Sequence, residues 1–402
     1  MPEETPFVSA REAMAASPDY DLDEFMQIIQ PKSEYSTPKS KGEKWDEEEK
    51  LWDEFNKIVK KDEIPNEEIL EIMNKLLEIN PKNLSAISNK GKAFTDSKKY
   101  EEALECYDLL LEIDENDLRA MLDKVDVLFL LEKLDEAVKI IKKVLEIDEK
   151  NLRAMISIST IFIQLRKYEE ALEHLDKALE NDDADDKKNF SNFHCLKGFA
   201  LTQLKKFEES TIHFDKAIKL DEKNPLAWNN KAIGLFGQGN FAEAIKAVDK
   251  VLEIIREDDG RKKYGLEKKY EIFGALMKGM CFTHLGRDDE AVECYEKINF
   301  DEDPALAKGG FFADKAVALG NVGRDEEALE CLEEALKKYP ENTFYLRNKG
   351  TGLNNLGRSE EALEIFDKVL EIDEKNLPAM KQKAGILGKM GKFEEVLRFC
   401  DK

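Results

Sequence analysis

Hydrophobic residues recur along most of the chain at the spacing of amphipathic helices. In one stretch Ile87 and Phe94 share a helical face, and after a short polar interval Tyr100, Leu104 and Leu111 share another. The interval often contains glycine, as in "LGR" at 285–287, and glycine ends a helix and lets the chain reverse. The pattern therefore predicts pairs of antiparallel helices joined by short turns.

Two columns of small residues repeat in register with these pairs, usually every 34 residues. Small side chains let two helices approach closely, and each pair keeps an uncovered apolar side, so copies must stack to form a core. The second-helix column contains Ala103, Ala137, Ala171, Ser210, Ala244, Ala291, Ala328, Ala362 and Val396, and the first-helix column contains Gly91, Val125, Ser159, Gly198, Ala232, Gly279, Ala316, Gly350 and Ala384.

These columns also fit a known 34-residue pattern of Trp, Leu, Gly, Tyr, Ala, Phe, Ala and Pro. It is matched by Trp228, Phe241, Ala244 and Val248 in one copy and by Gly350, Ala362, Phe366 and Val369 in another. In this pattern the chain resembles the tetratricopeptide repeat family over residues 84–402. The resemblance implies an all-α fold, a right-handed superhelical solenoid of stacked antiparallel helical hairpins with about nine to ten 34-residue repeats.

The repeats divide the chain into a tail and an array. The tail, 1–49, is expected to be largely disordered and to contain a candidate short amphipathic helix at 19–30, and the array is expected to occupy 50–402. Its predicted repeats are 50–83 (degenerate), 84–117, 118–151, 152–185, 191–224, 225–258, 272–305, 309–342, 343–376 and 377–402 (truncated). Two breaks in the period, near 185 and around 256–270, mark inserts that are looped out or lengthen a helix.

One column departs from the family pattern, because lysine replaces the leucine that often precedes the small first-helix residue. These lysines either form a binding feature or pack their aliphatic stems between hairpins while their ammonium groups meet glutamates of neighbouring helices. We favour the packing interpretation. The column contains Lys90, Lys124, Lys197, Lys231, Lys278, Lys315, Lys349 and Lys383.

Composition excludes several classes of partner. The formal net charge of -24 opposes attraction to nucleic acid or anionic membranes. No apolar run approaches the roughly 20 residues that span a bilayer, and the acidic start "MPEETPF" does not resemble a secretory signal. The 6 cysteines occur singly, which fits a reducing compartment. We therefore expect a cytoplasmic protein.

Candidate chemistry is sparse, so we predict no enzyme activity, cofactor or metal site. Cys106, Cys294 and Cys331 share one column in different repeats and are expected to be packing residues. The acidic loop around 182–186 lacks the glycine and the final glutamate of a calcium loop. The basic cluster at 261–269 could contact an acidic partner or a phosphate, but we interpret it as a solvated insert.

The resemblance also implies that the first helices line a concave groove. An apolar strip with a few amides suits an amphipathic helix or an extended peptide, although these side chains could instead pack helix against helix. Toward the C-terminus the same columns become polar and basic. The groove candidates are Leu122, Asp126, Phe129, Ile156, Thr160, Ile163, Phe199, Gln203, Asn229, Ile233, Phe236, Phe273, Leu276, Met280, Arg347, Asn354 and Lys381.

The tail contains one amphipathic segment, "SPDYDLDEFMQIIQP", with Leu22, Phe25, Met26 and Ile29 on one helical face. A helix this short is marginal alone in water, so we hypothesise that it docks in the protein's own groove or on a partner, with a disordered tail as the alternative. The resulting functional prediction is a scaffold or adaptor that binds a protein segment. A regulatory subunit acting through an acidic convex face is the main alternative, and a cryptic enzyme is the third.

Overall fold

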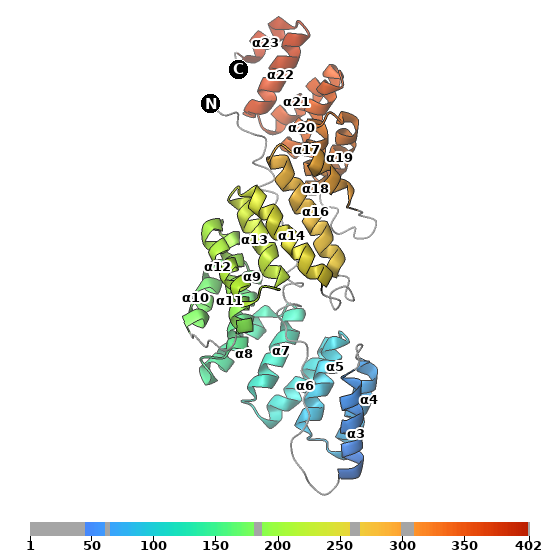
Figure 1. Ribbon diagram of the computed structural model, residues 1–402, viewed down its shortest axis with the longest axis vertical. Helices are drawn as coiled ribbons and strands as arrows, with labels where there is room; N and C mark the ends of the chain where they lie inside the picture. The colour runs from blue at the N-terminus through green and yellow to red at the C-terminus, as the bar shows by residue number, and fades with distance from the viewer. Residues whose placement is uncertain (1–44, 61–64, 181–186, 258–265, 299–308, 401–402) are drawn as a thin grey trace. The chain divides into compact units, whose positions relative to one another are not determined.

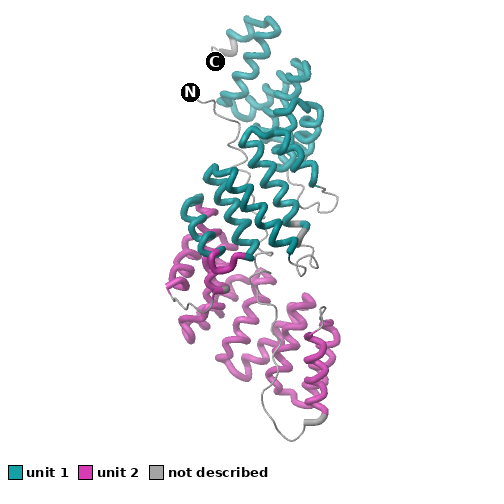
Figure 2. The backbone as a smooth tube through the Cα atoms, in the orientation of Figure 1, with its two compact units in different colours: residues 1–20, 205–218, 223–402 teal, residues 21–204, 219–222 magenta. Residues whose placement is uncertain are grey.

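The computed structural model describes residues 45–60, 65–180, 187–257, 266–298 and 309–400, and these residues form helices joined by turns (Figure 1). The chain separates into two compact units (Figure 2). The predicted all-α solenoid of helical hairpins is confirmed. The amphipathic segment of the tail, the acidic loop at 182–186 and most of the basic cluster lie outside the described residues.

One unit, formed by residues 21–204 and 219–222, contains the N-terminal helices. They are α3 (Trp45–Ile58), α4 (Asn66–Ile79), α5 (Leu84–Asp96), α6 (Tyr100–Ile113), α7 (Leu118–Leu130), α8 (Leu134–Ile147), α9 (Leu152–Gln164), α10 (Tyr168–Glu180) and α11 (Lys187–Gln203). Helix α3 begins five residues before the predicted start of the array, because Trp52 and Phe55 anchor it on α4 and its helical pattern extends back through an acidic first turn.

The second unit contains the remaining helices. They are α12 (Phe207–Leu220), of which residues 207–218 belong to this unit, α13 (Pro225–Gly237), α14 (Phe241–Glu257), α16 (Leu266–His284), α17 (Asp288–Glu296), α18 (Gly309–Asn321), α19 (Asp325–Lys338), α20 (Thr343–Asn355), α21 (Ser359–Ile372), α22 (Leu377–Lys389) and α23 (Phe393–Cys400). Helices next to the inserts are long, with 17 residues in α11 and α14 and 19 in α16. Part of each insert therefore lengthens a helix.

Local sequence sets both ends of the first helices. An asparagine or aspartate caps most of their N-termini; the Asn83 side chain, for example, accepts a hydrogen bond from the backbone N–H of Ala86 at 3.1 Å. Such caps contribute about 1 kcal/mol each. At the C-terminal turn one residue adopts positive φ, and the next N–H bonds back into the last helical turn, as from Lys99 to the carbonyl of Phe94 at 2.9 Å. The chain thus reverses between the two helices of a hairpin.

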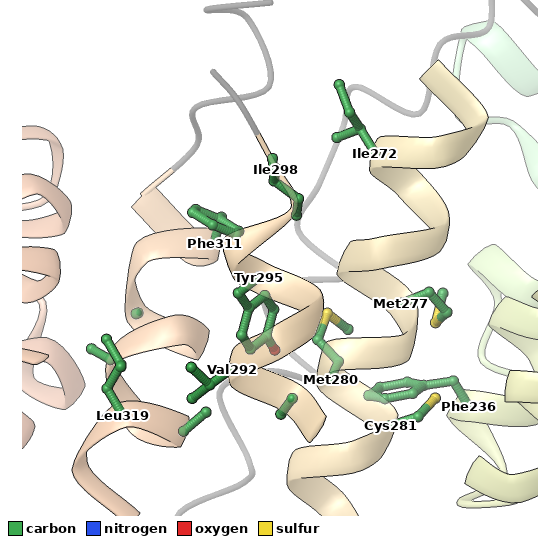
Figure 3. Close-up of a cluster of buried hydrophobic side chains, with 14 of the residues drawn as sticks. Phe236, Ile272, Met277, Met280, Cys281, Val292, Tyr295, Ile298, Phe311 and Leu319 are labelled. Atoms are coloured by element: carbon green, nitrogen blue, oxygen red, sulfur yellow. The ribbon is translucent and has the colours of Figure 1, made fainter. Parts of the chain in front are cut away.

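The small first-helix column accommodates buried rings of the second helix. A Cβ added at Gly91 would lie 2.9 Å from the ring of Tyr107, and one added at Gly279 would lie 2.6 Å from the ring of Tyr295. Tyr295 projects from α17 among Met280 of α16 and Phe311 of α18 (Figure 3). Glycine is therefore required where the second helix contributes a large ring.

The lysine column packs between hairpins and forms ion pairs. Each paired lysine of a first helix reaches the acid that lies five residues after the small column of the preceding second helix, and this acid is usually aspartate, not the glutamate that we expected. The shorter aspartate side chain is long enough for the ion pair because the aliphatic stem of the lysine spans most of the distance between the two helices. The pairs are Lys124 with Asp108, Lys197 with Asp176, Lys231 with Asp215, Lys278 with Asp249, Lys349 with Glu333 and Lys383 with Asp367.

Candidate functional site

The first helices of consecutive hairpins contact one another within each unit, as α7 contacts α9 and α16 contacts α18. Helices that approach their second neighbours in this way lie on the inner side of a stacked array. The predicted groove residues are on these helices.

The structure divides the predicted groove residues by exposure. About half are buried by packing of one helix against another: Leu122, Phe129, Ile156, Thr160, Ile163, Asn229, Phe236 and Met280. The half-buried ones are Asp126, Phe199, Gln203, Ile233, Phe273, Leu276, Arg347 and Asn354, and Lys381 is exposed. Two of the four phenylalanines in the predicted strip, Phe129 and Phe236, therefore belong to the core and are not open to a ligand.

Phe236 illustrates why the apolar strip of the sequence did not predict which of its side chains are buried. Its ring is 3% exposed and meets Phe241 at 5.3 Å and His284 at 5.2 Å between ring centroids. Phe241 and His284 also stack on each other at 4.5 Å. These contacts come from the second helix of the same hairpin and from the next first helix, so Phe236 fills the space between repeats.

A network of charged side chains lies on the inner helices of the N-terminal unit. Arg153 of α9 donates hydrogen bonds to Asp123 Oδ1 at 2.7 Å and to Asp126 Oδ2 at 2.5 Å, both on α7. Lys92 of α5 lies 4.0 Å from Asp123 Oδ2. Three consecutive hairpins are thereby linked through their first helices.

Burial controls the electrostatics of this network. Desolvation raises the pKa of Asp126 above its ordinary value, although the guanidinium of Arg153 opposes the rise. Desolvation also lowers the pKa of Arg153, but the two carboxylates outweigh it and leave that pKa raised. Asp126 was a predicted groove residue, whereas Arg153 and Lys92 were not predicted, because nothing in the sequence distinguishes them from the other lysines and arginines of the chain.

The inner helices of the C-terminal unit carry single charges in apolar surroundings. The guanidinium carbon of Arg347 lies 5.4 Å from the ring centroid of Phe344, and burial lowers the pKa of Arg347. Burial raises the pKa of Asp314 on α18 to about 7. Asp314 occupies the column position of Asp123, but Phe344 and Met280 stand where Arg153 and Lys92 stand in that network. Asp314 is a further residue that the sequence did not single out.

The five cysteines whose side chains the structure describes lack the features of reactive thiols. Burial raises the pKa of Cys106 to about 11 and that of Cys281 to about 12, so both thiols are protonated at neutral pH. Burial also raises the pKa of Cys294 and of Cys331. Among the described residues no three His, Cys, Asp or Glu side chains are grouped to hold a metal ion. Of the basic cluster, Lys268 is described and is exposed.

Family comparisons match several parts of the chain to repeat models. Residues 71–178 match the model described as anaphase-promoting complex, cyclosome, subunit 3. Residues 314–376, and residues 191–224 and 275–298, match two models described as tetratricopeptide repeat. A search of curated proteins gave no match. Within the described part of the chain, every helix is too short or too polar to cross a membrane.

Solved structures with a similar arrangement of helices are distant in sequence. A tetratricopeptide repeat protein from Parabacteroides merdae is 15% identical, with 67% of this chain and 98% of that chain covered and a TM-score of 0.47. YrrB, a tetratricopeptide repeat protein with an unusual peptide-binding site, is 20% identical, with 53% and 98% covered and a TM-score of 0.41. The Cut9–Hcn1 hetero-tetramer of the APC/C is 16% identical, with 82% and 77% covered and a TM-score of 0.44.

Proposed function

Because the chain belongs to the tetratricopeptide repeat family, we propose that it is a non-enzymatic scaffold that binds a segment of another protein along its first helices. Repeats of this family mediate protein–protein interactions and are generally non-catalytic. A cytoplasmic location is part of the proposal, since the cysteines occur singly and the described ones are free thiols.

The observation that carries the proposal is the set of half-buried apolar side chains on the inner helices. Ile233 of α13, together with Phe273 and Leu276 of α16, keeps part of its apolar surface uncovered, beside a core that holds Phe236 and Met280 in place. A rigid surface of this kind binds an amphipathic helix or an extended apolar peptide, because burial supplies affinity of about 25 cal/mol per Å² before the costs of association. Arg347 and Asn354 would contribute polar contacts to such a ligand.

The test replaces half-buried groove residues and leaves the core intact. Leu276→Asp and Ile233→Asp should each abolish capture of the partner, as identified by mass spectrometry after affinity purification of the full chain. Ile212→Asp is the matched control, because Ile212 is 55% exposed on the second helix α12. Circular dichroism should show equal helix content in all three variants. A partner captured equally by Leu276→Asp, Ile233→Asp and the unaltered chain would refute binding at this surface.

A second candidate function is that of a subunit in a larger assembly, acting through the acidic outer face. The match of residues 71–178 to a model named for a subunit of a complex favours it, and Glu101, Glu102 and Glu105 are exposed on α6 in that region. Reversing these three charges to lysine should then release the partner, with the capture strongest at low ionic strength. Groove variants would leave such a partner bound, which separates the two functions.

A further inference from the structure

Asp314 is a half-buried carboxylate on an inner helix of the C-terminal unit. Its helix, α18, contacts α16 and α20, the first helices on either side. Among the residues that the structure describes, no lysine, arginine or histidine forms an ion pair with Asp314. A charged group that leaves water without a partner is costly, so an unpaired half-buried carboxylate is a candidate for binding a ligand.

The equivalent carboxylate of the N-terminal unit is neutralised by the chain itself. Asp123 accepts a hydrogen bond from Arg153 at 2.7 Å, and the Lys92 ammonium lies 4.0 Å from its other oxygen. Both bases belong to neighbouring first helices. At Asp314 the positions of these bases are occupied by Phe344 and Met280. The array therefore repeats the carboxylate without repeating its bases.

Phenol rings pack near Asp314. Burial and, after it, the charge of Asp314 raise the pKa of Tyr345 on α20 to about 12. The same two causes raise the pKa of Tyr295 on α17. Both phenols are neutral at physiological pH, so neither can balance the charge of the carboxylate.

Two basic side chains on the same helix and on the next first helix have other neighbours. Lys315 follows Asp314 in α18 and lies near Cys331 of α19, where its charge opposes the effect of burial on the thiol pKa. The guanidinium of Arg347 lies beside the ring of Phe344. Neither base affects the pKa of Asp314, which burial raises. The carboxylate thus lacks a neutralising base among the described residues.

A basic side chain from outside would complete the missing ion pair. The usual cost of such a pair is the removal of water from both ions. Asp314 is already partly desolvated in the free protein, so binding has to remove water mainly from the incoming cation. Leu276 of α16 and Phe344 of α20 are half-buried, and their open surface suits the aliphatic stem of a lysine or arginine and its apolar neighbours.

We propose that Asp314 binds a lysine or arginine side chain of the protein segment that occupies the inner helices. This inference rests on the proposed function, and it adds the chemistry of the ligand. The segment is apolar where it contacts Leu276 and Phe344, and it carries one basic residue between these contacts. The net charge of -24 favours the approach of such a ligand over that of an acidic one.

Selection of random peptides displayed on phage, with the full chain as target, tests the proposal. Peptides that bind the unaltered chain and are lost on Leu276→Asp should share a lysine or arginine flanked by apolar residues. Selection on Asp314→Asn, which keeps the shape of the side chain, should not enrich the basic residue. Asp289→Asn is the matched control, because Asp289 is exposed on the second helix α17, and it should select the same peptides as the unaltered chain.

A selected peptide then allows a quantitative measurement. Norleucine in place of its basic residue keeps the aliphatic stem and should weaken binding to the unaltered chain at least about tenfold, but binding to Asp314→Asn much less. Calorimetry at pH 7 in buffers of different ionisation enthalpy gives a second readout. The basic peptide should release a proton from the carboxyl group of Asp314, whereas the norleucine peptide should not.

The outcomes separate this inference from the proposed function. The inference is overturned if peptides that require Leu276 show no preference for a basic residue, or if Asp314→Asn binds the basic peptide as tightly as the unaltered chain does. The proposed function would survive either result, because Leu276→Asp would still abolish binding. Failure to select any peptide sensitive to Leu276→Asp would overturn both.

Discussion

The contact between a first-helix glycine and a second-helix ring predicts an uncommon result: replacing this glycine by alanine inside a helix should destabilise the protein. A Cβ at Gly279 would lie 2.6 Å from Cε1 and Cζ of Tyr295, and a Cβ at Gly350 would lie 2.8 Å from Cζ of Phe366. Carbon atoms normally pack at about 3.5–4.0 Å. Both rings are fully buried, so neither can swing aside without displacing its neighbours.

The expected magnitude follows from two opposing effects. Overpacking of a well-packed core costs about 1–3 kcal/mol, whereas alanine favours a helix over glycine by about 1 kcal/mol. The difference between the two effects is about 0–2 kcal/mol. Because the clash is direct contact with a buried ring, we expect the upper part of this range, so Gly279→Ala and Gly350→Ala should each lower the free energy of unfolding by about 1–2 kcal/mol. Gly385→Ala is the control: its Cβ would meet no atom within 4 Å, and it should be stabilising.

A double-mutant cycle isolates the contact. Where the first-helix column has alanine, the second helix has an aliphatic residue: Ala316 and Leu332 belong to one buried cluster. Phe366→Leu should therefore relieve part of the cost of Gly350→Ala, with a coupling free energy of about 1 kcal/mol or more.

The assay must report on the repeats concerned. Long repeat arrays need not unfold in one step, so native-state hydrogen exchange of the amides in α20 and α21 is preferable to a single melting temperature. Strict additivity of Gly350→Ala and Phe366→Leu, or equal effects of Gly350→Ala and Gly385→Ala, would refute the contact as the reason for glycine.

Three further predictions concern turns and buried charges. Lys98 has a φ of 58°, so Lys98→Gly should raise the free energy of unfolding by about 1 kcal/mol in urea denaturation, and no gain would contradict the strain. Burial raises the pKa of Asp314 to about 7, so the folded state binds the carboxyl proton more tightly than the unfolded state does. The stability that this protonated carboxyl contributes is lost as pH rises from about 4 to 7. Asp314→Asn should therefore stabilise the protein more at pH 8 than at pH 5 in urea denaturation, and equal gains at the two pH values would contradict the raised pKa. Arg153→Met leaves Asp123 and Asp126 without their guanidinium and should cost about 3 kcal/mol at pH 7, less at pH 4 where carboxylates take up protons, as measured by denaturation at both values.

The lysine column illustrates how much of the packing was readable from the sequence. Its period and its amphipathic stems predicted ion pairs between hairpins, and the structure contains them. The partner residue was predicted wrongly as glutamate, because the sequence does not say which turn of the neighbouring helix faces the lysine. The pairing also explains the one repeat without a lysine in the lysine column, where the fully buried Ile158 stands instead. Its acidic partner is missing as well, because Lys142 occupies the position of the paired acid on the preceding second helix.

The sequence by itself determined the hairpins, their period and the family, because each depends on contacts between residues close in the chain or on a pattern repeated many times. Tertiary structure alone decided which apolar side chains stay open. Phe129 and Phe236 are buried while Phe199 and Leu276 are half-buried, although all four belong to the apolar strip that the sequence predicted. Helical periodicity defines an apolar face relative to a helix's own axis, but the cover over that face comes from helices of the next repeat.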